Sequence, residues 1–208
     1  MKKLLILLIL AIAAWFIYKN YFKAEKVEKV KPVPLAVSKH SEAFNISMIA
    51  ILENYYALAN GFVNWDTAVV NTKIVELQKS LNEFRAADLK VDTIIYQTAM
   101  LPWDNAKNNA SVIGGAVNWE ERRRAFRDLS ENLQFLLITV KYDNDKVYWQ
   151  ECPMAFGDDQ PANWLSKTEE VVNPYLGTKD PKYGNSMLHC GQTKMTIDFV
   201  AKDSTANP

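Results

Sequence analysis

Apolar side chains recur at spacings of three and four residues in successive stretches of the chain, the pattern of helices that bury one face. The first two stretches carry Phe44, Met48, Ile51, Leu52, Tyr55, Ala59, Phe62 and Val63, then Val70, Ile74, Leu77, Leu81 and Phe84. A later stretch carries Phe126, Leu129, Leu133, Leu136, Leu137 and Val140. With a shorter stretch between them, these segments predict an antiparallel four-helix bundle over residues 41–141.

A residue that favours the helix N-cap precedes each segment, because its short side chain can accept a backbone N–H of the first turn. These residues are Ser41, Asp66, Asp92 and Asn118. Gly61 weakens the first helix, and Pro102 is expected to break or kink the third. Residues 103–115 are rich in asparagine and end in two glycines, which indicates a loop or a frayed continuation of the helix.

The period changes after the turn signal at residues 143–145. Residues 146–151 are rich in strand-forming side chains, and residues 194–200 alternate apolar and polar side chains. If these two strands pair, their inner ends bring Cys152 and Cys190 together. We therefore predict a mainly α fold, in which the bundle is followed by a small Cys/Met subdomain containing a β-hairpin, residues 142–202. Residues 203–208 are expected to be a disordered tail.

The N-terminus reads as a signal anchor or a signal peptide. Two lysines precede the apolar run that begins at Leu4, and we favour an uncleaved anchor because bulky aromatics, not a small-residue cleavage site, follow that run. Residues 1–22 would form this transmembrane or signal helix, with residues 4–22 in the membrane. Residues 23–40, with Pro32 and Pro34, are expected to be an extended linker. The body would then lie in the periplasm of the cell envelope, tethered to the inner membrane, or be secreted to the periplasm after cleavage.

Charge is distributed unevenly. Residues 1–31 hold seven lysines and two glutamates, whereas the whole chain has 24 basic and 24 acidic residues. The body is therefore mildly acidic, which argues against nucleic acid as a partner. A cluster at the start of the fourth helix, Arg122, Arg123, Arg124 and Arg127, would be an anion patch or, as we prefer, a solvated face paired with Glu120, Asp128 and Glu131.

Soft ligands gather in two short segments. Cys152 and Met154 are two residues apart, and Met187, His189 and Cys190 lie together further along the chain. Thiolate and thioether suit Cu(I), so these five residues are the candidate metal site. The alternative is a structural disulfide between Cys152 and Cys190, which is the common state of two cysteines in an exported chain. Thiol redox catalysis and covalent haem are disfavoured, because the chain contains no Cys-x-x-Cys.

Four motifs follow one another in the second half of the chain: Cys152-Pro153-Met154-Ala155, Trp164-Leu165-Ser166, Asn173-Pro174-Tyr175-Leu176-Gly177 and Met187-Leu188-His189-Cys190-Gly191. In this order they resemble a bacterial domain family of unknown function, found mainly in Bacteroidota. Members of that family occur alone or fused to periplasmic adaptor subunits of heavy-metal efflux systems. The resemblance implies a periplasmic setting and a link to copper or related metals, but no established activity. Residues 178–185 depart from the family pattern as an apparent insertion.

Two functional hypotheses follow, and neither is an enzyme. The first is an envelope metal-handling protein that binds Cu(I) or a related soft metal and is linked to an efflux adaptor or another envelope protein. The second is a structural or protein-interaction module whose cysteines form a disulfide. The metal hypothesis requires Met154 and Met187 to act as ligands, whereas the second hypothesis leaves both as packing residues.

Overall fold

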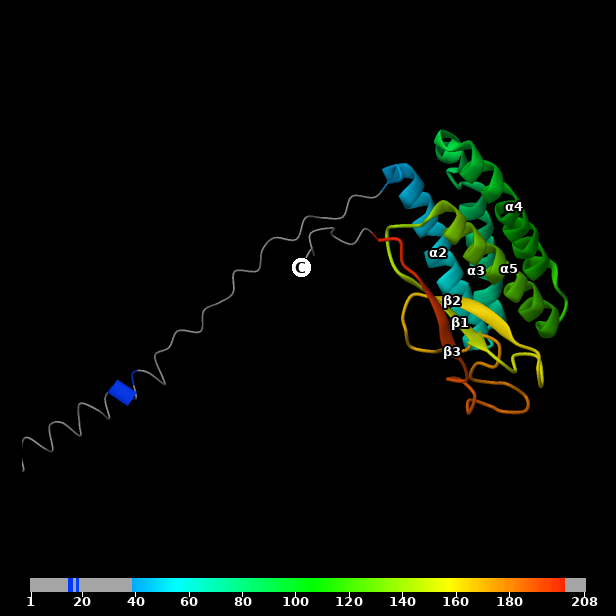
Figure 1. The fold of residues 1–208 in the computed structure, drawn as a ribbon. Helices are drawn as coiled ribbons and strands as arrows, with labels where there is room; N and C mark the ends of the chain where they lie inside the picture. The colour runs from blue at the N-terminus through cyan, green and yellow to red at the C-terminus, as the bar shows by residue number, and fades with distance from the viewer. Residues whose placement is uncertain (1–14, 17, 19–38, 201–208) are drawn as a thin grey trace, which may run out of the picture. The chain divides into compact units, whose positions relative to one another are not determined.

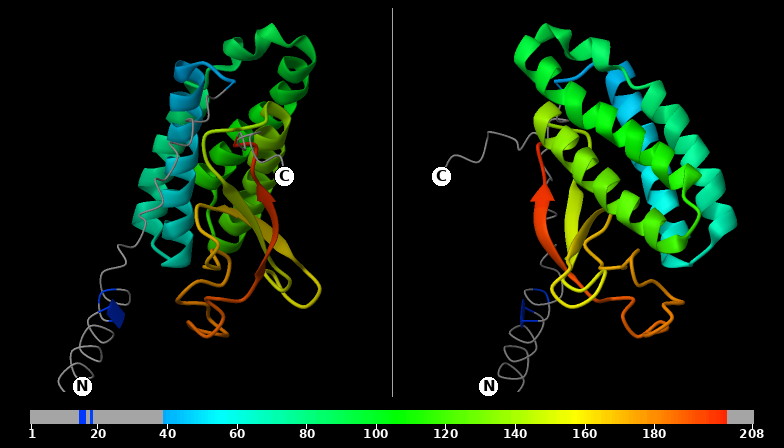
Figure 2. Two further views of the ribbon diagram at one scale, coloured as in Figure 1. Left: turned by 60° about the vertical axis from the view of Figure 1, so that its left-hand side comes forward. Right: turned by 90° about the vertical axis from the view of Figure 1, so that its right-hand side faces the viewer.

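The computed structural model describes residues 15–16, 18 and 39–200 (Figure 1). The fold is mainly helical, with a small antiparallel sheet of three strands. Its elements are α2 (Glu42–Val63), α3 (Thr67–Asn82), the 3-10 helix η1 (Ala86–Val91), α4 (Thr93–Gly115), α5 (Trp119–Val140), β1 (Val147–Cys152), β2 (Ala162–Ser166) and β3 (Gln192–Ile197). Helix α2 packs along α3, α3 along α4, and α4 along α5 (Figure 2).

The predicted N-caps are confirmed at all four helices. The side chains of Ser41, Asp66 and Asn118 each accept the backbone N–H three residues ahead, and Asp92 accepts from Ile94 and Ile95. Gly61 has a packing role, because a Cβ there would lie 3.0 Å from Val70 on α3. The first residues of the helices were therefore predictable from local chemistry alone.

Pro102 does not break the third helix, because α4 continues as a helix to Gly115. A proline inside a helix costs roughly 3 kcal/mol, and packing offsets it here. Pro102 lies on the buried face with Ala99, Ala106 and Ala110. Beyond the proline, the Trp103 indole donates to the Leu81 carbonyl at 2.8 Å, which ties α4 to α3. Of the two readings of residues 103–115, the helical continuation is correct.

Strand β1 is the centre of the sheet and pairs antiparallel with both β2 and β3. The two predicted strands do pair, with a register shift between Trp149 and Gln150. Periodicity did not predict β2, because Trp164 and Leu165 are adjacent and both buried, so the strand does not alternate. Figure 2 shows the strands along one side of the helices.

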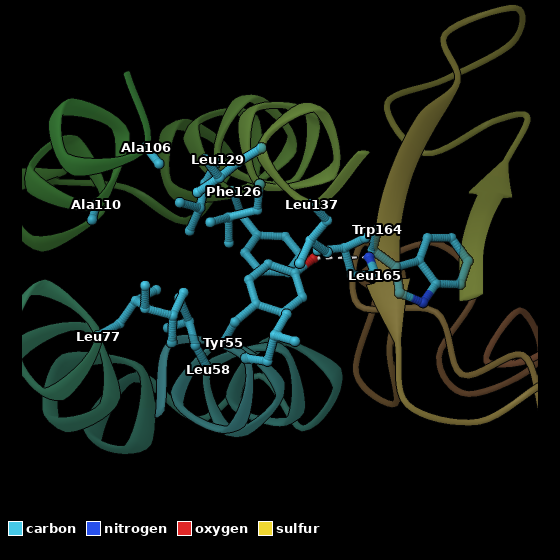
Figure 3. Close-up of a cluster of buried hydrophobic side chains, with 14 of the residues drawn as sticks. Tyr55, Leu58, Leu77, Ala106, Ala110, Phe126, Leu129, Leu137, Trp164 and Leu165 are labelled. Atoms are coloured by element: carbon cyan, nitrogen blue, oxygen red, sulfur yellow. Dashed lines mark hydrogen bonds between the residues drawn. The ribbon is translucent and has the colours of Figure 1, made fainter. Parts of the chain in front are cut away.

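Two tyrosine hydroxyls from other parts of the chain satisfy the outer edge of β2. The Tyr55 hydroxyl accepts the backbone N–H of Leu165 at 3.1 Å, and Tyr175 donates to the Asn163 carbonyl. Figure 3 shows the Tyr55 ring between the helices, with its oxygen directed at β2. An unpaired strand edge is a template for association, and here two side chains occupy it.

The arginine cluster on α5 differs from the solvated face that we expected. Ion pairs do form at 2.7 Å, from Arg124 to Glu120 and from Arg127 to Asp128. However, the guanidinium groups of Arg123, Arg124 and Arg127 also lie 5.2, 4.5 and 5.8 Å from the centre of the Phe156 ring. Cation–π contacts of this kind hold the loop between β1 and β2 against α5.

Three predictions concern the chain ends: a signal or transmembrane helix over residues 1–22, a linker that includes residues 23–38, and a tail over residues 203–208. These residues lie outside the described part of the chain, except for Trp15, Phe16 and Tyr18. These three residues are helical and exposed. Within the described residues, no helix has the length and apolar character that crossing a membrane requires.

Candidate functional site

The two cysteines lie together, as pairing of the predicted strands required. Cys152 ends β1 opposite Ala162 of β2, and Cys190 lies two residues before β3. Their Sγ atoms are 3.5 Å apart. Cys152 is completely buried, whereas Cys190 is partly exposed. A disulfide has an S–S distance of about 2.05 Å, so the structure holds two thiols in contact and not a bond.

Gly191 allows the Cys190 segment to approach β1 closely. Its φ of +142° lies in the region that L side chains rarely adopt. A Cβ at this position would lie 2.6 Å from the Glu151 carbonyl oxygen and 3.1 Å from the Trp164 ring. Only glycine therefore lets the backbone pass directly over the end of β1, which places Cys190 beside Cys152.

Asn173 also holds the segment that carries Cys190. Its side chain is completely buried, and its Nδ2 donates to the Cys190 carbonyl at 2.8 Å. Its Oδ1 accepts the backbone N–H groups of Tyr175 and Leu176, the pattern of an asparagine turn. Its own N–H donates to the Leu188 carbonyl at 2.8 Å. One asparagine thus links the turn at 173–177 to the segment that carries Cys190.

Burial raises the pKa of the Cys152 thiol from 9.0 to about 11. The neighbouring Cys190 thiol raises it further, while the backbone N–H of Met154 and the Asn173 side chain act in the opposite direction. Cys152 is therefore protonated at neutral pH. Because the thiolate is both the nucleophile and the metal ligand, either use of this residue requires a proton to leave a dry site.

The five predicted ligands differ in their burial and in the contacts that they make. Met154 and Met187 are half-buried and pack against the hydrophobic core. His189 is exposed, and its Nδ1 lies 2.7 Å from the Val171 carbonyl oxygen, so the ring is held at the 171 backbone. Among the described residues, no group of three or more His, Cys, Asp or Glu side chains is arranged to hold a metal ion. The close pair is Cys152 with Cys190.

Two residues that sequence reasoning left out of the site, Asn173 and Gly191, determine its geometry. Both stand in the motifs quoted for the family resemblance, and Asn-Pro-Tyr-x-Gly is also a turn signature. No protein-family model, curated protein or solved structure matches the chain. The interpretation of the thiol pair therefore rests on its own geometry and chemistry.

Proposed function

We propose that this chain is a non-catalytic module of the cell envelope whose Cys152 and Cys190 form a disulfide that locks the Cys/Met subdomain. The observation that carries the proposal is the 3.5 Å separation of the two Sγ atoms. Oxidation forms the S–S bond by removing two electrons and two protons, which a thiol–disulfide exchange oxidant of the periplasm would accept. A movement of about 1.5 Å completes the bond.

The segment that the bond would close has little regular structure of its own. Between Cys152 and Cys190 the only helix or strand in the described part of the chain is the five-residue β2. A disulfide closing 38 positions lowers the entropy of the unfolded chain, which is worth roughly 3–4 kcal/mol. Such a bond stabilises a long segment that has few strand–strand hydrogen bonds to hold it in place.

The envelope setting is supported by the apolar run at residues 4–18 and by the family resemblance. A tethered module of this kind would act by contact with another envelope protein, and a heavy-metal efflux adaptor is the partner that the resemblance suggests. The Cys152–Cys190 bond would keep the contact surface ordered in a compartment where thiols are oxidised.

Thiol counting under denaturing conditions tests the disulfide. Protein is taken from the periplasmic side without reductant, with alkylation during lysis, and its mass is compared before and after reduction. We expect no alkylated cysteine before reduction and two after it. A Cys190→Ser variant is the control, because its single remaining Cys152 must be alkylated without reduction. Two alkylated cysteines in the unreduced wild-type protein would contradict the proposal.

Binding of Cu(I) is a second candidate function, favoured by the same distance. Two thiolates on one tetrahedral soft ion, each at about 2.3 Å, lie about 3.8 Å apart, close to the 3.5 Å between these sulfur atoms. Met154, Met187 or His189 would have to complete the ligand set. Competition titration of the reduced protein with a Cu(I) chelator tests this, with Met154→Leu/Met187→Leu as the variant. Unchanged affinity would assign both methionines to packing.

A further inference from the structure

A cavity of about 290 Å³ lies away from the thiol pair in the fold, between α2, the turn after α5 and the adjoining ends of β1 and β2. Its wall includes three tyrosines, two carboxylates and two lysines on three different segments of the chain. These residues are Glu53, Tyr56, Tyr142, Asp145, Lys146, Tyr148 and Lys167. Neither the disulfide nor the soft-metal proposal uses any of them.

The tyrosines give the wall aromatic surface that carries no charge of its own. Tyr142 is buried and Tyr56 is half-buried. Desolvation, with the charge of Asp145 adding to it, raises the pKa of Tyr142 to about 12 and also raises the pKa of Tyr56. Both phenols therefore stay neutral, with electron-rich ring faces. Among the described residues nothing donates to or accepts from the Tyr56 hydroxyl.

The charged side chains of the wall differ in whether they form ion pairs. Glu53 is held by Lys167 at 2.6 Å, and Lys146 is directed to Asp198 at 3.5 Å. The carboxylate of Asp145 accepts the Asn144 amide at 2.8 Å, and no described lysine, arginine or histidine forms an ion pair with it. Counted with Asp198, the partner of Lys146, the three carboxylates exceed the two lysines by one negative charge. Asp145 is the wall carboxylate without an ion pair, although it lies near enough to Lys167 to help raise the pKa of that lysine.

We propose that this cavity binds a small organic cation with an alkylammonium or quaternary ammonium group, with tyrosine rings against the cationic head and Asp145 as the counter-charge. Aromatic faces beside a carboxylate are the chemistry that recognises such cations. The volume suits a head group with a short substituent and not a large ligand. An anionic ligand would have to displace Glu53 from Lys167.

The test is calorimetric titration of the full chain in detergent with choline and with its uncharged isostere, 3,3-dimethylbutan-1-ol. We expect choline to bind with a Kd of about 1 mM and the isostere at least about tenfold more weakly. Equal affinity for the two would overturn the proposal, since it would show an apolar or hydroxyl-binding cavity. No heat of binding for choline at ten times that concentration would overturn it as well.

Two variant pairs identify the residues involved. Asp145→Asn should weaken choline binding about tenfold, whereas Asp158→Asn, which removes a carboxylate from the distant β1–β2 loop, should leave it unchanged. Tyr148→Phe keeps an aromatic face and should bind choline normally, whereas Tyr148→Leu should bind several-fold more weakly. The proposal fails if Asp145→Asn binds as the wild type does, or if both members of either pair lose affinity equally. The thermal melt of each variant confirms folding.

Discussion

The hydroxyl of Tyr55 accepts a hydrogen bond from the backbone N–H of Leu165 at 3.1 Å, across 110 positions of sequence. The same hydroxyl lies 2.7 Å from Ser130 Oγ, which in turn donates to the Phe126 carbonyl. One buried oxygen thus joins α2, α5 and β2. Because the N–H of Leu165 belongs to the outer edge of the sheet, this contact also determines where the sheet ends.

Removing that hydroxyl should destabilise the body without changing its fold. Tyr55→Phe keeps the ring but leaves the N–H of Leu165 buried without its partner, which costs roughly 1–3 kcal/mol. Urea unfolding of the reduced protein measures the loss. Tyr96→Phe is the matched control, because no described residue forms a hydrogen bond with its half-buried hydroxyl. Equal stability of Tyr55→Phe and wild type would show that the hydrogen bond contributes nothing.

The contribution of the disulfide should appear only under oxidising conditions. Cys190→Ala should unfold at lower urea than the oxidised wild type, with a difference in unfolding free energy of roughly 3–4 kcal/mol. After reduction of both proteins the difference should fall below about 1 kcal/mol. A large difference that persists in reductant would assign the effect of Cys190 to packing and not to a bond.

Substitution of Gly191 should destabilise the protein more than substitution of a glycine at which a Cβ has room. Gly191→Ala places a Cβ 2.6 Å from the Glu151 carbonyl oxygen at a positive φ, whereas Gly184→Ala has a φ of +59° and nothing within 4 Å. A non-glycine residue in the left-handed region costs roughly 1–3 kcal/mol, so Gly184→Ala measures the cost of a left-handed backbone at a site where the Cβ has room. Gly191→Ala should lose distinctly more stability and form the Cys152–Cys190 bond more slowly, as followed by alkylation during reoxidation.

The raised pKa of Cys152 predicts a specific pH dependence in the reduced protein. The folded state holds the thiol proton up to about pH 11, whereas the ordinary value is 9.0. Between these pH values the folded protein binds more protons than the unfolded chain, so stability is complete below pH 9 and declines as pH rises towards 11. The loss should reach about 2 kcal/mol.

Cys152→Ser provides the reference for this pH series. Tyrosine and lysine titrations are common to both proteins, so the difference in unfolding free energy between wild type and variant isolates the thiol. That difference should decrease from pH 9 to 11. A constant difference over this range would show that the Cys152 pKa is not raised.

Some of the fold follows from the order of residues and some does not. The caps at Ser41 and Asn118 were predictable because each involves a backbone N–H only three residues away. The effect of Pro102 was misjudged, since its cost is local but the packing of Ala99 and Ala106 that offsets it is not. Strand β2 was missed because the adjacent Trp164 and Leu165 are both buried, so the strand does not alternate apolar and polar side chains.

The candidate site shows the same division. The soft residues and the two segments that carry them were evident in the sequence, and the pairing of β1 with β3, which brings Cys152 to Cys190, was predicted as a condition. The contact of His189 with the Val171 carbonyl and the parts played by Asn173 and Gly191 were not evident.

By itself, the sequence determined the helices and the residues at which they start. It also showed that two separate segments both carry soft sulfur side chains. Those features depend on backbone hydrogen bonds and side-chain periodicity within one or two turns. Only the tertiary structure decided how closely the two sulfur atoms approach and which polar groups close the sheet. Atoms separated by 38 or 110 positions are brought within hydrogen-bonding distance by burial of the whole core and not by any local preference.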